Sequence, residues 1–313
     1  MDEVAAVLDR EFPDSEPTAR RVVHRGNHKR TTLVSFPDRE VVVQVAPDTA
    51  ALATEVDLAR AIRDRTSVPV PDVLAAGTLD AAGPRAAVGY AVLARVAGDD
   101  LHERFVALDA DVQAAIARRF GGILAELHEA FAFDAFGEVH PTADGFAATG
   151  PTHWREWVTA HVDAGITALP AAFDDLRGPV RAALDDGPTD PPARLYPWDL
   201  RPGNALVVGE DLTAVLDWGY PLAADPGLAV AKCQHLVADW YVDDDRTRDR
   251  LREAFRAGYE AVRPWPTVTR AYRLAAVVLS AVDSRGEVTR PGYPERRGEA
   301  AVAFHRDRLR AFL

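Results

Sequence analysis

The stretch from Tyr196 to Gly219, YPWDLRPGNALVVGEDLTAVLDWG, contains two short apolar runs, ALVV and LTAVL, separated by a glycine-containing turn. Each run adjoins a polar residue that a buried strand does not need: Asn204 precedes the first run and Asp217 follows the second. With a tight turn over residues 209–212, antiparallel pairing places Asn204 opposite Asp217, and directly opposed residues have Cβ atoms about 5 Å apart. The stretch therefore predicts a β-hairpin whose open end carries an amide oxygen and a carboxylate side by side.

These oxygens predict a metal site. Amide and carboxylate oxygens suit Mg²⁺, which prefers one or two protein oxygens completed by water and phosphate. Asp199, five residues before Asn204, lies on the loop that leads into the hairpin and can reach the same space. Taken singly, each of the three residues is more simply a turn or capping residue. Together they match the needs of phosphoryl transfer, in which one residue orients the attacking hydroxyl and two hold metal.

The rest of the chain predicts an α+β protein of two lobes. Its 313 residues, 48% of them hydrophobic, are enough for two modest cores. The first lobe, residues 1–95, is expected to be a small antiparallel β-sheet with one helix packed on it. Its pattern predicts a short leading helix at 1–12, a loop at 25–30 between two strands, a strand at 39–46, a helix at 48–65, and strands at 73–77 and 87–96.

The second lobe, residues 96–313, is expected to be larger and mostly helical. Helical periodicity occurs at 112–131, 154–169, 176–184, 247–262 and 267–282. The hairpin is the one clear β element that the pattern predicts in this half.

The amino-acid composition limits the kinds of binding partner and the cellular compartment that we expect for this protein. A net charge of −12 leaves no basic stripe, which argues against a nucleic-acid partner. The single cysteine, Cys233, cannot form an intrachain disulfide, so the cytoplasm is the expected compartment. The acidic first residues do not resemble a secretory signal, and the apolar run at 274–282 is shorter than the roughly 20 residues that cross a bilayer. We therefore expect no membrane association, and the oligomeric state stays open.

The basic residues are almost all arginine. Of the 36 lysines and arginines, only Lys29 and Lys232 are lysines. An acidic, arginine-rich surface is typical of a salt-adapted, halophilic protein. GC-rich codon usage explains the same bias, and the sequence leaves both explanations open.

The loop and hairpin resemble one known family. PWDLRPGN, from Pro197 to Asn204, followed by LDWG at 216–219, is similar to the motif of the aminoglycoside phosphotransferase and choline kinase-like family. That motif is a His-Gly-Asp-Leu-His-Pro-Gly-Asn loop, then a hairpin and an Asp-Trp pair. The resemblance runs from Val22 to Pro226 and includes VPVPDVL at 68–74, AVLARVAGDDL at 91–101 and ILAELHEAF at 123–131. It implies a bilobal protein-kinase-like fold.

The resemblance also implies an activity: ATP-dependent transfer of the γ-phosphate to a hydroxyl of a sugar, amino sugar or amino alcohol. By this resemblance Asp199 is the catalytic base or hydroxyl-orienting residue. Asn204 and Asp217 bind Mg²⁺ that bridges the ATP phosphates. The backbone from Ala94 to Val96 hydrogen-bonds adenine.

One departure from the family pattern concerns the phosphate clamp. Glu55 stands where the family places the acid that fixes a phosphate-binding lysine, but the expected lysine position is Gln44. An amide can donate hydrogen bonds yet brings no charge toward the phosphates. Lys29 and Arg30, at the end of HRGNHKR, are the candidate substitutes, and the simpler alternative is that both are solvated loop charges.

Two further departures affect the catalytic loop. Pro197-Trp198 replaces the His-Gly pair, and Trp198 is expected to pack inward. Ala229 replaces an acid that in the family steadies the loop. These changes, with Gln44, leave open the alternative of a catalytically impaired nucleotide-binding pseudokinase with a sensing or scaffolding role.

The acceptor is suggested only by ADWYVDDDRTRDR, residues 238–250, where acids lie beside Trp240 and Tyr241. Carboxylates and aromatic rings could hold a cationic acceptor. The alternative is a helix-capping acidic turn, which we favour for Asp245, with both aromatic residues in the core.

Overall fold

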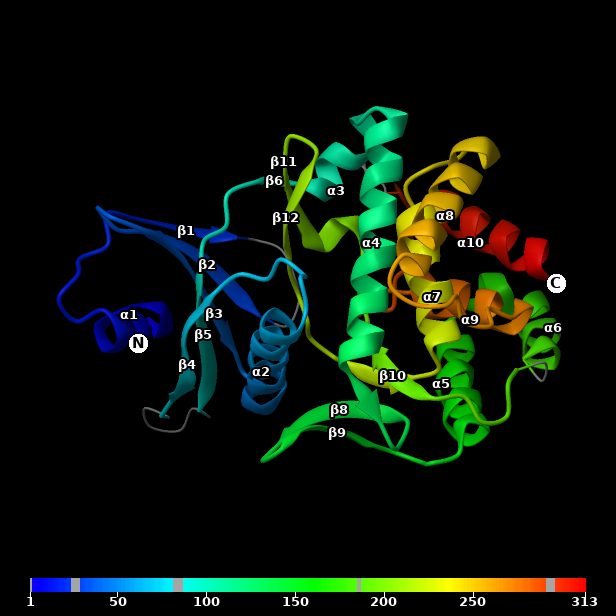
Figure 1. Cartoon of the computed structure of the whole chain (residues 1–313), viewed down its shortest axis with the longest axis horizontal. Coiled ribbons are helices and arrows are strands. Elements are labelled where there is room, and N and C mark those ends of the chain that lie inside the picture. Colours follow the sequence, from blue (N-terminus) through cyan, green and yellow to red (C-terminus); the bar gives the residue numbers. More distant parts are fainter. Residues whose placement is uncertain (1, 24–28, 81–86, 185–186, 291–295) are drawn as a thin grey trace.

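The computed structural model describes residues 2–23, 29–80, 87–184, 187–290 and 296–313. Figure 1 shows an N-terminal lobe built on a β-sheet and a larger C-terminal lobe built mainly of helices. The α+β, bilobal architecture predicted from the sequence is confirmed. The exact domain boundary at residues 95/96 stays a prediction.

The N-terminal lobe is a five-stranded antiparallel sheet in the order β1-β2-β3-β5-β4. Its strands are β1 Ala19–Val23, β2 Arg30–Ser35, β3 Glu40–Ala46, β4 Val73–Leu79 and β5 Val88–Ala94. Most of the predicted loop at 25–30 lies outside the described residues, and Arg30 already belongs to β2. Each predicted strand of this lobe is therefore present within one or two residues of its expected bounds.

Strand alternation gives the two faces of the sheet different partners. Alternate residues of a strand point to opposite faces, so Val41, Val43 and Val45 share one face and Gln44 and Ala46 the other. The valine face packs on helix α1 (Glu3–Glu11), and the other face on helix α2 (Thr49–Arg65), where Ala46 joins Leu52 and Val56. Gln44 therefore lies on the α2 face of the sheet.

Helix α2 links the two lobes. Asp48 caps it by accepting a hydrogen bond from the Ala51 amide at 2.9 Å, which satisfies a first-turn donor. Leu52 and Val56 pack on the sheet, whereas Leu58 and Ile62 belong to the core of the C-terminal lobe. Glu55 is thus held on a helix that contacts both lobes.

The C-terminal lobe is built around α4, which packs against α8 along its length (Figure 1). Its helices are α3 Leu101–Arg104, α4 Ala110–Ala130, α5 Trp154–Ala168, α6 Asp174–Ala183, α7 Pro226–Gln234, α8 Asp245–Glu260, α9 Arg270–Ala281 and α10 Glu299–Phe312. A π-helical turn, His235–Asp239, continues α7. The five predicted helices are present, and α3, α7 and α10 were not predicted. Within the described residues, no helix is both long and apolar enough to cross a membrane.

The expectation that the hairpin is the one clear β element of this half is wrong. A second five-stranded sheet, in the order β7-β10-β13-β8-β9, lies in the C-terminal lobe, and β14 Thr289–Arg290 pairs with β15 Arg296–Arg297. The sheet strands are β7 Ala132–Phe133, β8 Gly137–Thr142, β9 Gly145–Thr149, β10 Ala193–Tyr196 and β13 Leu222–Ala224. β7, β13, β14 and β15 have only two or three residues, too few to show a period-two pattern, and β8 (GEVHPT) contains a proline, which argues against a strand prediction.

The hairpin itself is present, with a different register. Strands β11 (Ala205–Val208) and β12 (Asp211–Val215) form a sheet with β6 (Asp99–Asp100). Val208 pairs with Asp211, so the turn is Gly209-Glu210, with Gly209 at a left-handed φ of 61°. Thr213 is an extra residue on β12, because Leu206 pairs with Ala214 while Val207 pairs with Leu212.

The predicted pairing of Asn204 with Asp217 is therefore wrong. Ala205 pairs with Val215, and the Leu216 amide donates to the Asn204 carbonyl at 2.8 Å. Leu216 stands across from Asn204, and Asp217 lies one residue beyond it. The turn begins earlier than expected and the bulge adds a residue, and a sequence pattern of two apolar runs reveals neither.

Candidate active site

The catalytic-loop candidate, residues 197–204, joins β10 to β11 and is organised around Asp199. The Asp199 carboxylate accepts hydrogen bonds from Arg201 Nε at 2.8 Å and Asn204 Nδ2 at 3.1 Å. Burial alone would raise the pKa of this carboxyl, but the charges of Arg201 and Lys232 and these hydrogen bonds outweigh it and lower the pKa. Asp199 is therefore an ionised carboxylate fixed by residues of its own loop.

Asn204 is oriented in a way that fits a metal ligand. Its Nδ2 also donates to the main-chain oxygen of Asp199 at 2.9 Å, so the amide nitrogen is turned toward Asp199 and Oδ1 lies on the opposite edge of the group. Among the described residues, no three His, Cys, Asp or Glu side chains converge as a metal cluster. An ion held by Asn204 and Asp217 would take its remaining ligands from water and phosphate, as Mg²⁺ commonly does.

Asp217 follows β12 with a strained backbone. Its φ of 63° and the φ of 54° at Tyr220 are the two left-handed values among the described residues other than glycine. This conformation costs a non-glycine residue about 1–2 kcal/mol and is often found at functional sites. The Asp217 side chain is half exposed, at 51%.

Lys29 joins three separate parts of the chain at this point. Its Nζ lies 2.5 Å from Glu55 Oε1 on α2 and 3.0 Å from Asp217 Oδ1 after the hairpin. Burial alone would lower the pKa of Lys29, but the two carboxylates outweigh burial and raise it. A charged ammonium therefore stands between the two acids.

The remaining nucleotide-site candidates are placed as follows. Gln44 lies opposite Thr31 in the β2–β3 register, and Lys29 directly precedes β2, so the Lys29 ammonium comes from the segment that leads into the strand beside Gln44. Arg30 points elsewhere: its Nη2 lies 2.6 Å from Glu3 Oε2 on α1. The Ala94 amide donates to the Asp72 carbonyl at 2.8 Å and the Arg95 amide to the Glu40 carbonyl at 3.2 Å, so both amides are engaged within the N-terminal lobe.

The acids expected to hold a cationic acceptor are engaged within the C-terminal lobe. Asp239 is buried and pairs with His235 and Arg252, and Asp243 pairs with Arg290 and Arg296. Asp244 accepts from the Thr247 amide at 2.8 Å and is the cap of α8, so the capping role favoured for Asp245 belongs to its neighbour. Asp245 is the first residue of α8 and pairs with Arg248.

The two aromatic residues of this segment belong to the core, as the second of the two interpretations of the sequence predicted. Trp240 and Tyr241 are 6% and 5% exposed. Tyr241 also forms a hydrogen bond with His102 Nδ1 at 3.0 Å.

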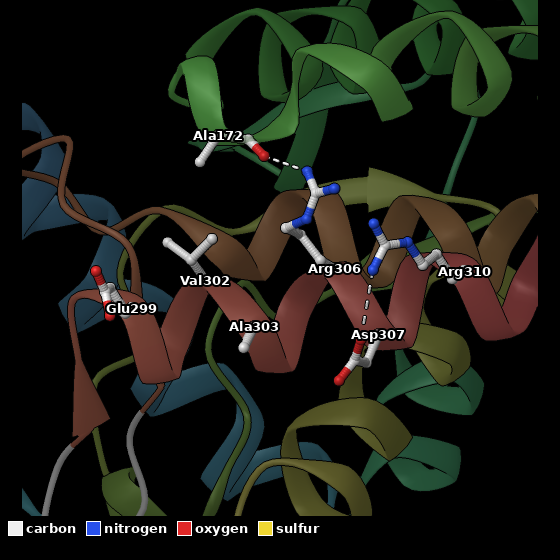
Figure 2. Close-up of a pocket in the computed structure, with 7 residues that line it drawn as sticks. All are labelled: Ala172, Glu299, Val302, Ala303, Arg306, Asp307 and Arg310. Atoms are coloured by element: carbon white, nitrogen blue, oxygen red, sulfur yellow. Dashed lines mark hydrogen bonds and ion pairs between the residues drawn. The ribbon is translucent and has the colours of Figure 1, made fainter.

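A hollow of about 340 Å³ along α10 is not the active site. Figure 2 shows its arginines turned to nearby protein groups: Arg306 toward the Ala172 carbonyl and Arg310 toward Asp307. The hollow is lined by none of the predicted site residues, and Figure 1 places α10 on the side of the C-terminal lobe away from the N-terminal sheet.

Two residues of the site were not predicted from the sequence. Arg201 binds Asp199, and Lys232, on α7, contacts the catalytic loop. The sequence held a signal for each: DLRPGN carries arginine where the family loop has histidine, and Lys232 is one of only two lysines.

Comparison with known proteins agrees with this fold. A model of the phosphotransferase enzyme family (APH) matches residues 20–268, so the chain belongs to that family of kinases. No curated protein sequence matches the chain.

Solved structures show the same fold at low sequence identity. A thermostable mutant of aminoglycoside phosphotransferase APH(4)-Ia, in a ternary complex with AMP-PNP and hygromycin B, has a TM-score of 0.69 at 18% identity. That match covers 100% of this chain and 98% of the other. A mutant of aminoglycoside 2'-phosphotransferase-IIIa with GDP has a TM-score of 0.62 at 13% identity, over 99% of this chain and 96% of the other.

Proposed function

We propose that this protein is a Mg²⁺- and ATP-dependent kinase that transfers the γ-phosphoryl group to a hydroxyl of a small molecule. The Lys29 bridge between Glu55 and Asp217, beside the Asp199–Asn204 loop, carries this proposal. It joins a cation, a helix acid and the candidate metal ligand that are far apart in the sequence. Such an arrangement is what binding of a metal–polyphosphate requires.

In this proposal Lys29 takes the role that Gln44 cannot fill. Its ammonium would contact the phosphates of ATP, with Glu55 fixing its position. Asn204 and Asp217 would hold Mg²⁺, which neutralises charge on the phosphates when bound. The backbone from Ala94 to Val96 would hydrogen-bond the adenine.

Asp199 would orient the acceptor hydroxyl for in-line attack. The hydroxyl oxygen bonds to the γ-phosphorus as the bond to the β–γ bridging oxygen breaks, ADP leaves with that electron pair, and the hydroxyl proton passes to the Asp199 carboxylate. The lowered pKa of Asp199 makes it a weak base. Its main contribution is therefore orientation, which suits a loose transition state in which the proton moves late.

The acceptor class in this proposal is a sugar, amino sugar or amino alcohol. One structural relative holds hygromycin B, an observation that concerns that protein alone. Because Asp239, Asp243, Asp244 and Asp245 are engaged in ion pairs or a helix cap, they are poor candidates for binding a polycation. A neutral sugar is the simpler acceptor for the described site.

The test is ADP release from MgATP in the presence of a panel of sugars, amino alcohols and aminoglycosides. We expect acceptor-dependent turnover in the natural chain. Asp199→Asn keeps the shape of the side chain but cannot accept the proton, and should lower kcat by about 10²–10⁴-fold. The proposal fails if no acceptor stimulates ADP release, or if Asp199→Asn turns over as fast as the natural chain.

A further inference from the structure

Both lysines of the chain lie at the candidate active site, although arginine fills every other basic position. Lys29 bridges Glu55 and Asp217, as described above. Lys232 lies on α7, where it is 2% exposed among apolar neighbours such as Val230 and Ala231. An ammonium in such a position is costly, because burial penalises the charged form.

The contacts of Lys232 are with the catalytic loop. Its Nζ donates to the Trp198 carbonyl at 2.7 Å and lies 3.1 Å from the centre of the Trp198 ring. The Tyr196 ring lies beyond, at 5.6 Å. Cys233, the next residue of α7, donates from Sγ to the Leu200 carbonyl at 3.3 Å. Two consecutive side chains of α7 therefore hold the carbonyls on either side of Asp199.

The charge of Lys232 is coupled to Asp199. Burial lowers the pKa of Lys232 to about 7, and the Asp199 carboxylate is the main group that opposes this fall. The nearby carboxylate therefore favours the charged form of Lys232.

The geometry also explains why this residue is lysine. A compact ammonium can sit over the face of an indole and donate to a single carbonyl at the same time. A planar guanidinium needs more room and several acceptors, as Arg201 has in Asp199 and Tyr241. A purely structural position on α7 would be better served by an apolar residue, because that residue would avoid the cost of burying a charge.

We infer that Lys232 is a positioning residue that fixes the loop around Asp199 in the geometry needed for phosphoryl transfer. The inference rests on the proposed kinase function. Lys232 acts through the backbone at Trp198 and through its charge, and Asp199 remains the residue that contacts the acceptor. Asn204 donates two hydrogen bonds to Asp199, so fixing the position of Asp199 also fixes the position of this metal-ligand candidate.

The test compares Lys232→Met with the natural chain by steady-state kinetics and by amide hydrogen exchange of residues 197–204. Methionine keeps the length of the side chain and removes the charge and the donor. We expect kcat to fall by at least about tenfold, because small displacements of a catalytic group are costly, while KM for ATP changes less than about twofold. Exchange in the loop should become at least about tenfold faster, because its carbonyls lose a partner.

Val230→Ala is the matched control. Val230 is fully buried on the same helix and its side chain has neither a charge nor a hydrogen-bond donor, so its truncation destabilises α7 without removing a polar contact to the loop. We expect a lower melting temperature with kcat within about twofold of the natural chain. If Lys232→Met fails to fold, Lys232→Gln is measured in the same way, and the same fall in kcat is expected because the charge is lost.

The inference is overturned if Lys232→Met keeps both kcat and loop exchange at the natural values. It is also overturned if kcat falls equally in Lys232→Met and Val230→Ala, since the residue would then be merely structural. Hydrogen exchange needs no turnover, so an effect on the loop in a chain that phosphorylates none of the acceptors would refute the kinase proposal while showing that Lys232 holds the loop.

Discussion

At the scale of single residues, Lys29, just before β2, brings a positive charge to Glu55, which the neutral Gln44 on β3 cannot do. Gln44 occupies the position where the family has its lysine, and Lys29 pairs with Glu55 from the adjacent segment. The Coulomb interaction of a cation depends on where its charge lies and not on the strand that carries it. The loss of one lysine therefore does not predict the loss of the site.

Lys29→Ala should weaken the use of ATP strongly. Removing a preorganised cation from a charged substrate costs about 10²–10³-fold, so we expect kcat/KM for ATP to fall by about that factor. The double variant Lys29→Ala/Gln44→Lys should recover part of the loss, because residue 44 lies on the face of the sheet that α2 covers, and Glu55 is a residue of α2. Equal ATP kinetics in Lys29→Ala and the natural chain would contradict the role of Lys29.

Arg30→Ala should have little effect on nucleotide binding. Arg30 pairs with Glu3 on α1, and both side chains are partly exposed, at 47% and 31%. Exposed ion pairs contribute about 0–1 kcal/mol, so a change in ATP affinity of less than about twofold is expected by equilibrium titration. A tenfold loss would show that Arg30 leaves Glu3 and moves to the phosphates when ATP binds.

At the scale of elements, two glycines allow α4 and α8 to pack in direct backbone contact. A Cβ on Gly121 would collide with the Phe255 carbonyl, and a Cβ on Gly258 would collide with the Arg118 carbonyl. The obstacles are backbone atoms of the facing helix, which cannot rotate away. The helices would have to separate to accept either side chain.

Gly121→Ala and Gly258→Ala should each destabilise the protein by about 3 kcal/mol, at the upper end of typical overpacking costs. Gly178→Ala is the control, because Gly178 is exposed on α6 and a Cβ there would meet nothing within 4 Å. A change below about 1 kcal/mol is expected for this control. Urea denaturation measures all three, and a small effect at both Gly121 and Gly258 would mean that the crossing is looser than described.

At the scale of the whole molecule, buried histidines should make stability fall as the pH falls below neutrality. Burial lowers the pKa of His161 to about 4 and of His305 to about 3, and it lowers those of His128 and His235 as well. Unfolded histidines bind protons near pH 6.5, so between that pH and the folded pKa the unfolded chain holds more protons. Each such histidine then removes up to about 1.4 kcal/mol of stability per pH unit as acid is added.

We expect the free energy of unfolding, measured with urea, to decrease from pH 7 to pH 5.5. Lys232 also makes stability increase with pH, but over a higher pH range. Its pKa in the folded chain is lowered to about 7, so above pH 7 the unfolded chain binds one more proton and the free energy of unfolding should continue to rise. Burial raises the pKa values of Asp225 and Glu55, so at lower pH these two carboxyl groups make the free energy of unfolding increase as acid is added.

His161→Phe should reduce the slope between pH 7 and 5.5, because it keeps the stack on Trp157 and removes one proton site. His153→Gln, at an exposed position, is the matched control and should leave the slope unchanged. A free energy of unfolding that is constant over this range would contradict the prediction.

The residues of the candidate site could be chosen from the sequence more easily than their arrangement in space. Asp199, Asn204 and Asp217 were chosen as candidates because polar residues adjoin two apolar runs, a feature that is visible in the sequence, and their roles stay a prediction. The opposition of Asn204 and Asp217 was wrong because the turn position and the bulge at Thr213 are set by the twist and packing of the hairpin. The strands of the second sheet were missed because several have only two or three residues and because β7, β10 and β13 pair with segments far away in the chain.

The sequence alone determined the N-terminal sheet with its helices, the long helices of the second lobe and the loop that carries the candidate catalytic residues. These features follow from local periodicity, caps and turns, which neighbouring residues control. Only the tertiary structure decided that Lys29 meets Glu55 and Asp217, and that Lys232 lies beneath Trp198. The partners lie 26, 188 and 34 residues apart in the chain, and of the three contacts only that of Lys29 with Asp217 joins the two lobes.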